Sequence, residues 1–228
     1  MKRSTFISRK SLMLGGLLTL AIAAPALAVG VASHPSVVAP YVEFLRGEAP
    51  TAAPTQQVTV WDGADLDGDG AADISNPTGQ APRGHDDFGD GYFGASRDGG
   101  ERAHAGVDYM AQAGQTVRAP ISGFVSKVGY AYADDANLRF VEITNPALGI
   151  TARTFYIDPK VEVGQAVHLG WPIGTAQDLQ PRYAGITEHV HLEIDRAGRK
   201  LDAATLLHAR LETVPLMAAT VSRTAAGD

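Results

Sequence analysis

Two stretches of the sequence decide its fold and its chemistry: Arg102–Tyr109, which reads RAHAGVDY, and His189–Glu193, which reads HVHLE. Together they contain three histidines and an aspartate, in a chain that has no cysteine. Two histidines and one aspartate around zinc, with a fourth position left to water, form the ligand set of a catalytic site. Closed structural sites use four protein ligands and usually include thiolates. The two stretches therefore indicate a metallohydrolase-type domain.

The first stretch is predicted to be extended rather than helical. His104 and Asp108 are four positions apart, which on a helix would place both on one face. Gly106 interrupts the stretch, however, and Val107 and Tyr109 on either side of the aspartate favour a strand. On a strand, residues 104, 106 and 108 share a face, so both ligands converge and the glycine leaves room between them.

The second stretch is predicted to be a half-buried strand that carries two imidazoles toward a pocket. Its period of two places His189, His191 and Glu193 on one face, and the apolar Val190 and Leu192 on the other. One histidine can then ligate the metal while its neighbour moves a proton.

The order of these motifs resembles that of the lysostaphin/LytM-type zinc endopeptidases, which cut peptide cross-links in bacterial cell walls. That family has H-x-G-x-D, then a strand rich in aromatic residues, then V-x-x-G-x-x-V-x-x-G-x-x-I-G, then H-x-H. Here residues 161–174 supply the long run as VEVGQAVHLGWPIG, and the resemblance covers roughly residues 90–205. Residues 155–159 (FYIDP) and 183–191 (YAGITEHVH) look more similar still to chemotaxin-like members, animal proteins that are not thought to be working peptidases.

Carried over residue by residue, the resemblance makes His104, Asp108 and His191 the zinc ligands. It makes His189 the general base, or the group that orients the attacking water. The reaction that it implies is hydrolysis of a peptide bond, in which the metal polarises the developing oxyanion and His189 manages the proton.

One position departs from the family's pattern. The family normally has a second catalytic histidine two residues after a tyrosine on the intermediate strand. Here Tyr156 is that tyrosine, and Asp158 stands where the histidine is expected. A different alignment puts Tyr156 itself in the histidine's position. Both side chains would share one face of a strand, so both are expected to be able to approach the metal and are candidate catalytic residues.

Residues 1–28 have the pattern of a signal peptide. A start with four basic residues and no acidic one leads into the apolar run Leu12–Ala24, and Ala26–Ala28 supplies an A-x-A cleavage site. The run is short for a membrane span, which leaves an uncleaved anchor as the less favoured alternative. No cysteine follows the cleavage site, so a lipoprotein is excluded. We expect the general secretory route, a periplasmic or secreted protein, and no stable membrane span after cleavage.

Residues 29–55 are interpreted as a linker, and the segment 56–89 contains an acidic D-x-D-x-D-G-x-x-D loop. Alternating carboxylates followed by glycine can converge on one hard cation. An EF-hand would have a glutamate at the twelfth position, where this chain has Asn76, so the loop resembles the calcium loops of hairpins more closely. Calcium is favoured over a solvated acidic turn because such close carboxylates repel one another without a cation. The candidate calcium ligands are Asp65, Asp67, Asp69 and Asp73.

The expected fold class is mainly β. Residues 90–210 are predicted to form a compact antiparallel β-sheet or β-sandwich domain of the lysostaphin/LytM type, with long loops and a short helix capped by Asp202. Residues 211–228 are interpreted as a C-terminal tail. The strand candidates bounded by Gly, Pro or Asn are residues 58–61, 116–120, 123–128, 139–143 and 152–157.

A long loop is predicted on the approach to the site. Residues 76–103 are dense in Gly, Asp, Arg and Asn, and long loops of compact domains are commonly functional. Within this loop, Arg97 and Arg102 are candidates to bring positive charge near the metal, and the alternative is that they are salt-bridged surface groups.

Two functions from different classes remain open at this stage. The first is an exported zinc endopeptidase that acts on peptidoglycan cross-links. The second is a zinc-containing binding or regulatory module that has lost catalysis and acts through a protein partner. The replaced histidine separates them, since losing one donor to the oxyanion costs on the order of 10²–10³ in rate. The formal charge of −6, which becomes −10 without the four basic residues of 1–28, argues against nucleic acid as a partner.

Overall fold

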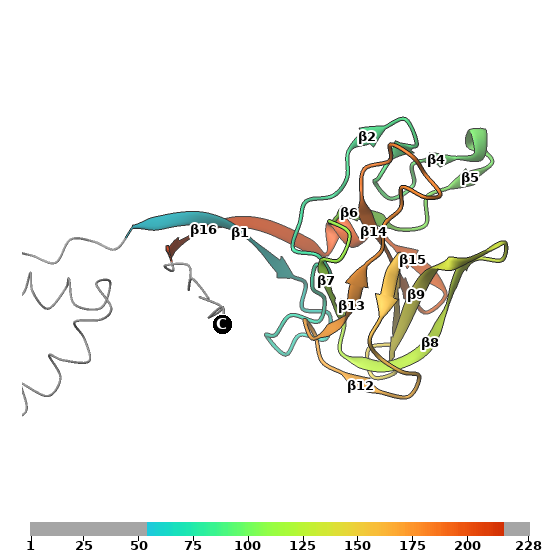
Figure 1. Ribbon diagram of the computed structural model, residues 1–228. Coiled ribbons are helices and arrows are strands. Elements are labelled where there is room, and N and C mark those ends of the chain that lie inside the picture. Colours follow the sequence, from blue (N-terminus) through green and yellow to red (C-terminus); the bar gives the residue numbers. More distant parts are fainter. Residues whose placement is uncertain (1–53, 217–228) are drawn as a thin grey trace, which may run out of the picture. The chain divides into compact units, whose positions relative to one another are not determined.

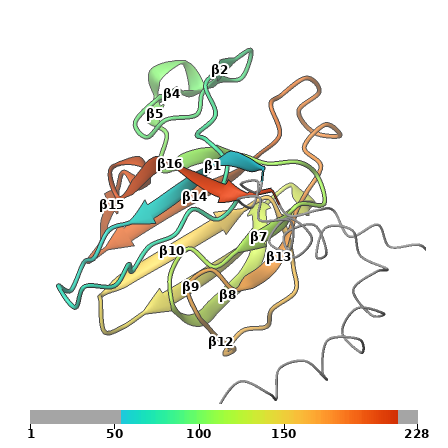
Figure 2. The ribbon, with the colours of Figure 1, turned by 90° about the vertical axis from the view of Figure 1, so that its left-hand side faces the viewer.

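The computed structural model describes residues 54–216 (Figures 1 and 2), so the predicted signal peptide and most of the predicted linker lie outside the described residues. Residues 57–213 form one compact unit, the first unit, and the described residues 54–56 and 214–216 fall outside it. The first unit contains both the acidic segment and the predicted metal-binding domain. No helix within residues 54–216 is long and apolar enough to cross a membrane.

A seven-stranded antiparallel sheet forms the larger layer of the first unit (Figure 2). Six strands follow the order β12-β8-β9-β10-β14-β15, and β6 pairs with β14. Along β14 the residues that face the core are apolar, because the alternation of HVHLEIDR places every second side chain on that face. The strands are β6 (Val107–Met110), β8 (Gly123–Tyr132), β9 (Asp135–Asn145), β10 (Ile150–Phe155), β12 (Ala166–Val167), β14 (His189–Arg196) and β15 (Arg199–Leu201).

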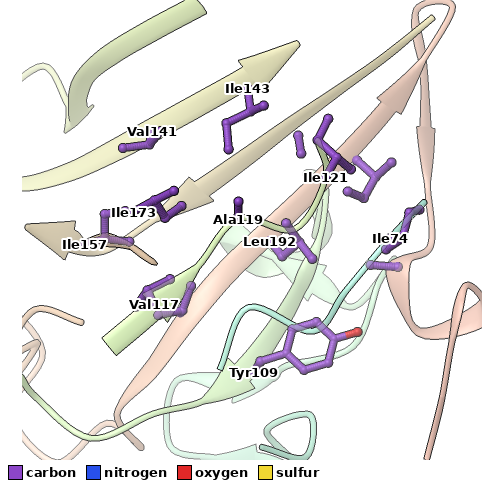
Figure 3. Packing of buried hydrophobic residues seen from close by; sticks show 14 of the residues in the cluster. Ile74, Tyr109, Val117, Ala119, Ile121, Val141, Ile143, Ile157, Ile173 and Leu192 are labelled. Carbon is purple, nitrogen blue, oxygen red and sulfur yellow. The ribbon is translucent and has the colours of Figure 1, made fainter. Parts of the chain in front are cut away.

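A smaller antiparallel sheet packs against the larger one and closes the core (Figure 3). It consists of β7 (Thr116–Arg118), β11 (Ile157–Pro159) and β13 (Pro172–Ala176), in the order β11-β13-β7. Ile143 and Leu192 of the large sheet belong to the same core cluster as Ile157 and Ile173 of the small one, and all four are fully buried. Burying each such side chain contributes about 1.5–3 kcal/mol, so the packing of the two sheets stabilises the fold.

The mainly antiparallel β fold is therefore confirmed, and each strand candidate lies on or overlaps an observed strand. Residues 58–61 fall in β1 (Thr55–Gly63).

The C-terminal prediction is wrong in part. Asp202 does cap a helix, but this helix is the single 3₁₀ turn η2 (Ala203–Thr205). The next residues form β16 (Leu207–Pro215), which pairs with β1, because β1 supplies the hydrogen bonds that the tail lacks by itself. Residues 217–228 lie outside the described part.

The long loop at residues 76–103 contains short paired segments. In the first pair, β2 (His85–Asp86) bonds to β3 (Gly89–Asp90). In the second pair, β4 (Ser96–Arg97) bonds to β5 (Arg102–Ala103), and the 3₁₀ turn η1 (Asp98–Gly100) connects the two strands. The predicted continuous strand through residues 104–108 is wrong, since β5 ends at Ala103 and β6 begins at Val107. His104 therefore reaches the site from a connecting segment.

Candidate metal centre

Strand pairing places two of the predicted metal ligands opposite each other. Asp108 of β6 is the cross-strand partner of His191 of β14. His104 joins them from the segment before β6, and this close approach depends on Gly106. A Cβ atom at residue 106 would lie 2.8 Å from Cε1 of His191, so only glycine leaves room for the imidazole.

Three donor atoms of these residues meet at one point. Nε2 of His104 lies 3.1 Å and Nδ1 of His191 lies 2.9 Å from Oδ1 of Asp108, and the two nitrogens are 2.9 Å apart. All three side chains are buried. The structure thus brings together the three residues that the family resemblance implied as ligands, and it does so as a compact triangle of donor atoms.

The outer hydrogen bonds of the two imidazoles determine which nitrogens face inward with a lone pair. Nδ1 of His104 donates to the Tyr92 carbonyl at 2.8 Å, and Nε2 of His191 donates to Oε1 of Glu193 at 3.4 Å. When both imidazoles are neutral, each carries a single proton, which these outer acceptors hold on the outer nitrogen, so the two inner nitrogens are acceptors. Two lone pairs and a carboxylate oxygen then converge, an arrangement that a metal cation stabilises and that outer acceptors orient. The donor set therefore fits a metal ion.

His189 faces the same point from a greater distance. Its Nδ1 donates to the Thr187 carbonyl at 2.7 Å, which leaves Nε2 as an acceptor 3.7 Å from Oδ1 of Asp108. Burial lowers the pKa of His189 below its ordinary value, although the negative charge of Asp108 opposes this shift. A neutral imidazole with its lone pair directed at the metal position can accept a proton from a water molecule there.

The second oxygen of Asp108 is held by an arginine that sequence reasoning missed. Arg83 directs Nη2 (2.9 Å) and Nε (3.3 Å) at Oδ2. Arg97 lies further away, at 3.6 Å, while Arg102 is exposed and pairs with Asp98. No sequence motif marks Arg83. It could have been expected only because a buried aspartate that has one oxygen on a metal needs a hydrogen-bond donor for its other oxygen.

The acidic character of Asp108 follows from these neighbours. Burial raises the pKa of this carboxyl, but its close contacts with the His104 and His191 imidazoles lower it more. The net result is a pKa well below the ordinary range, so Asp108 is a carboxylate at neutral pH.

Asp158 does not approach the metal position, and its predicted catalytic placement is wrong. It lies on β11, where it pairs with Lys160 (2.6 Å) and is 3.8 Å from Arg139, with its side chain 46% exposed. The expectation that residues 156 and 158 share one strand face fails because Tyr156 breaks the strand between β10 and β11. Its φ of 65° is in the left-handed region, which a tyrosine adopts only when its surroundings require it.

Tyr156 itself does reach the site. Its ring meets the His189 ring edge-on at 5.4 Å between centroids, and its hydroxyl lies 2.6 Å from the hydroxyl of Tyr132. Burial raises the pKa of Tyr156 to about 12, so the hydroxyl remains a donor at neutral pH. Of the two alignments considered from the sequence, the structure favours the one that puts Tyr156 in the position of the second histidine.

A cleft of about 450 Å³ opens over the four side chains. One part of its lining is aromatic, and another part is basic and includes Arg97 and Arg102. The aromatic residues are Phe88, Tyr132, Phe155, Tyr156 and Tyr183. The reactive groups therefore lie at the base of a groove large enough for a few residues of a peptide-like molecule.

The acidic loop brings together three of its four candidate ligands. Oxygens of Asp65, Asp67 and Asp73 lie within 4.8 Å of one another, whereas Asp69 is not part of this group and accepts a hydrogen bond from the amide of Ala71. Asp65 accepts from two backbone amides, and these bonds lower its pKa. The calcium site stays a prediction.

Comparison with known proteins identifies a family and several similar chains. Residues 102–203 match peptidase family M23. Myeloid protein 1 of Gallus gallus is 34% identical over 120 residues, which are 52% of this chain and 36% of the chicken protein. Leukocyte cell-derived chemotaxin-2 of Mus musculus is 32% identical over 108 residues, 47% of this chain and 69% of the mouse protein. The structure of the antimicrobial peptidase lysostaphin from Staphylococcus simulans superposes with a TM-score of 0.41 and 19% identity, over 50% of this chain and 46% of that chain.

Proposed function

Because the chain belongs to peptidase family M23, we propose that it is an exported zinc metalloendopeptidase that hydrolyses the peptide cross-links of peptidoglycan. The observation that carries this proposal is the arrangement of four side chains at one point. Three donor atoms converge at Oδ1 of Asp108, and the lone pair of His189 is directed there from 3.7 Å. A ligand triangle with a base beside it is the arrangement that metal-assisted hydrolysis requires.

The donor chemistry favours zinc. Two imidazole nitrogens and one carboxylate oxygen leave one tetrahedral position open, which is the pattern of catalytic zinc sites. His104, Asp108 and His191 would hold the ion. When bound, zinc supplies a Lewis acid that stabilises negative charge developing on the substrate carbonyl.

The protein's own groups divide the proton chemistry between them. His189 is neutral and oriented by the Thr187 carbonyl, so it takes the proton of the attacking water and returns it to the leaving amine. Tyr156 and Tyr132 share one hydrogen bond between two hydroxyl groups. When Tyr132 donates this bond, the hydroxyl proton of Tyr156 is free. Tyr156 can then donate it to the developing oxyanion, in place of the family's second histidine.

Digestion of peptidoglycan tests this function directly. The zinc-loaded chain without residues 1–28 is incubated with purified sacculi, with and without a chelator, and released peptides are identified by mass spectrometry. We expect release that the chelator abolishes. The matched control is His189→Ala, which should keep its zinc and lose activity. A fully zinc-loaded wild type that releases nothing from any peptidoglycan type would refute the peptidase proposal.

A second candidate function is a binding or regulatory module that uses the same cleft. It is favoured by one observation, the tyrosine at the position where the family has an imidazole. The related proteins of chicken and mouse are also named as a myeloid protein and a chemotaxin rather than as peptidases. In this case the zinc-loaded wild type would be inactive on sacculi but would capture peptidoglycan fragments or a protein partner.

Export is proposed from residues 1–28 alone. A basic start, an apolar run and an A-x-A site are the parts of a cleaved secretory signal. We expect the mature protein to begin at Val29 and to lie in the periplasm or the medium. N-terminal sequencing of the native protein and cell fractionation check both points, and an intact N-terminus in the membrane fraction would favour an anchor.

A further inference from the structure

Arg83 is a buried cation whose partners extend beyond the metal ligand. Its side chain is only 3% exposed, yet it lies on the loop before β2. Besides the two contacts to Asp108, its Nη1 donates to the Gly89 carbonyl at 2.9 Å and pairs with Oδ1 of Asp86 at 2.7 Å. A guanidinium without water must satisfy its donors within the protein, so this residue holds two carboxylates in fixed positions.

The contact with Asp108 decides which oxygen is free for the metal. Oδ2 receives both Arg83 donors, whereas Oδ1 faces His104, His191 and the more distant His189. An aspartate held in this way offers one oxygen only. Its position relative to the metal is therefore set by the guanidinium as well as by its own strand.

Asp86 carries the connection to the opposite side of the cleft. Its second oxygen accepts a hydrogen bond from the backbone amide of Thr187 at 3.0 Å. The carbonyl of the same Thr187 accepts from Nδ1 of His189 at 2.7 Å. Asp86 thus fixes the backbone at Thr187, and the Thr187 carbonyl in turn orients the His189 imidazole. Next to it, Phe88 and Tyr183 meet edge-on at 5.7 Å between ring centroids and add a second contact between the two loops.

Four of these groups are linked in series to Asp108 and form a circuit: Arg83, Asp86, Thr187 and His189, whose Nε2 returns to 3.7 Å from Oδ1 of Asp108. We propose that the Arg83–Asp86 ion pair is a positioning device that fixes the base relative to Asp108. The loop of β2 and β3 is then part of the working site although it touches neither metal nor reacting atoms. The consequence for catalysis rests on the proposed peptidase function, whereas the positioning of the imidazole does not.

The test removes the middle of the circuit and compares it with a nearby ion pair. Asp86→Ala breaks the links to both Arg83 and Thr187, and Asp86→Asn keeps one acceptor oxygen. The matched control is Asp90→Asn, which removes the exposed pair with His85 on the same hairpin. Each variant of the full mature chain is measured for zinc affinity by chelator competition, for kcat and KM, and for solvent exchange of the His189 Nδ1 proton by NMR of ¹⁵N-histidine-labelled protein.

We expect Asp86→Ala to bind one zinc ion with an affinity less than about tenfold below that of the wild type, since Asp86 does not contact the ligand Asp108 directly. Arg83→Gln, which removes the direct contact with Asp108, should lower the zinc affinity about 10–100-fold. In Asp86→Ala, kcat should fall at least about tenfold while KM stays within about twofold, because a misplaced base affects the transition state and not binding. The His189 Nδ1 proton should exchange faster. Asp86→Asn should be intermediate, and Asp90→Asn should match the wild type.

Two results would overturn the proposal: wild-type proton exchange at His189 in Asp86→Ala, or equal losses in Asp90→Asn, which would mean a general effect of the hairpin. If Asp86→Ala does not fold, the same comparison is made with Asp86→Asn. A zinc-loaded wild type without activity, combined with faster His189 exchange in Asp86→Ala only, would refute the peptidase function and support the positioning circuit.

Discussion

The buried group of His104, Asp108 and His191 and the mostly exposed group of Asp65, Asp67 and the half-buried Asp73 each bring three donor atoms together, but they satisfy those atoms differently. In the buried group the available protons point outward, to Tyr92 and Glu193, so acceptors face one another across the centre. In the exposed loop, backbone amides point inward and donate to the carboxylates. The first arrangement needs a cation, and the second already has donors.

This difference shows that repulsion between nearby carboxylates is a weak argument for a metal. Water and backbone N–H groups can offset like charges at an exposed loop, where the effective dielectric is high. A buried site has neither, so its unsatisfied lone pairs are much better evidence for a bound ion. The two groups can be separated by experiments that remove one donor from each.

The largest effect is expected from Asp108→Ala. This change removes a ligand and also leaves the buried Arg83 with only one of its two carboxylate partners, Asp86, and breaking a buried ion pair costs about 3–5 kcal/mol. The corresponding change in the loop, Asp67→Ala, is expected to alter stability by no more than about 0.5 kcal/mol. Urea unfolding of both variants, with zinc analysis of the purified proteins, checks the difference. Comparable losses in the two variants would contradict it.

The next effect concerns the donor beside the buried group. Tyr156→Phe should lower kcat about 10²-fold, because it removes the hydroxyl directed at the oxyanion. Tyr156→His should restore the family's imidazole and raise kcat above the wild type at least tenfold, equivalent to about 1.4 kcal/mol. Histidine is also among the side chains that tolerate a left-handed backbone.

Asp158→His is the matched control for that prediction, since Asp158 lies away from the cleft with Lys160. It should leave kcat within about twofold of the wild type, well below the tenfold step that one transition-state contact provides. A higher kcat in Asp158→His, without a higher kcat in Tyr156→His, would favour the other alignment, in which Asp158 occupies the position of the family's second histidine.

These two residues also show how far sequence reasoning reached at the site. The alternation in HVHLE predicts a strand with two imidazoles on one face, because a period of two depends only on local geometry. Gly106 was likewise interpretable as a point of close approach. The sequence left open whether Tyr156 or Asp158 approaches the metal. A single left-handed residue changes the sheet face on which the following side chains lie, and no local sequence pattern predicts that conformation.

Arg83 escaped prediction for a different reason. Its role arises from contacts with residues far away along the chain, and its neighbours are the same Gly and Asp residues that make a solvated loop. The C-terminal strand β16 was missed similarly, because its pairing partner β1 stands at the other end of the described chain. Both errors concern tertiary partners, whereas the strand candidates that local alternation marked, apart from the continuous strand through residues 104–108, lie on or overlap observed strands.

Calcium provides a smaller test, on the exposed group. If the loop binds calcium in the millimolar range, a tenfold excess over Kd stabilises the fold by about 1.4 kcal/mol, which raises Tm by a few degrees, about 3–5 °C. Asp67→Ala combined with Asp69→Ala should abolish the shift and leave the zinc content unchanged. Differential scanning calorimetry with and without calcium measures it. No shift in the wild type would make the loop an acidic turn held by its own amides.

The smallest expected effect compares two carboxyls whose pKa values are both lowered, Asp86 near the site and Asp65 in the loop. Burial raises the pKa of Asp86, but the amides of Thr187 and Phe88 and the guanidinium of Arg83 lower it to about 2, from an ordinary 3.8. The folded state therefore binds fewer protons than the unfolded state between these values. The contribution of Asp86 to stability is complete above about pH 4 and is lost as the pH falls through 2.

Asp86→Asn should accordingly be less stable than the wild type at pH 5 and should lose less stability on acidification to pH 2. Asp65 is fully exposed, and its pKa is lowered mainly by the amides of Gly70 and Gly68, so Asp65→Asn should change the acid dependence less because water screens the group. Chemical unfolding of the zinc-free proteins between pH 5 and 2 removes the effect of metal release. If both asparagine variants followed the wild-type curve equally closely, the ion pair of Arg83 with Asp86 would not hold the loop in the folded state, and the two regions would differ less than their burial indicates.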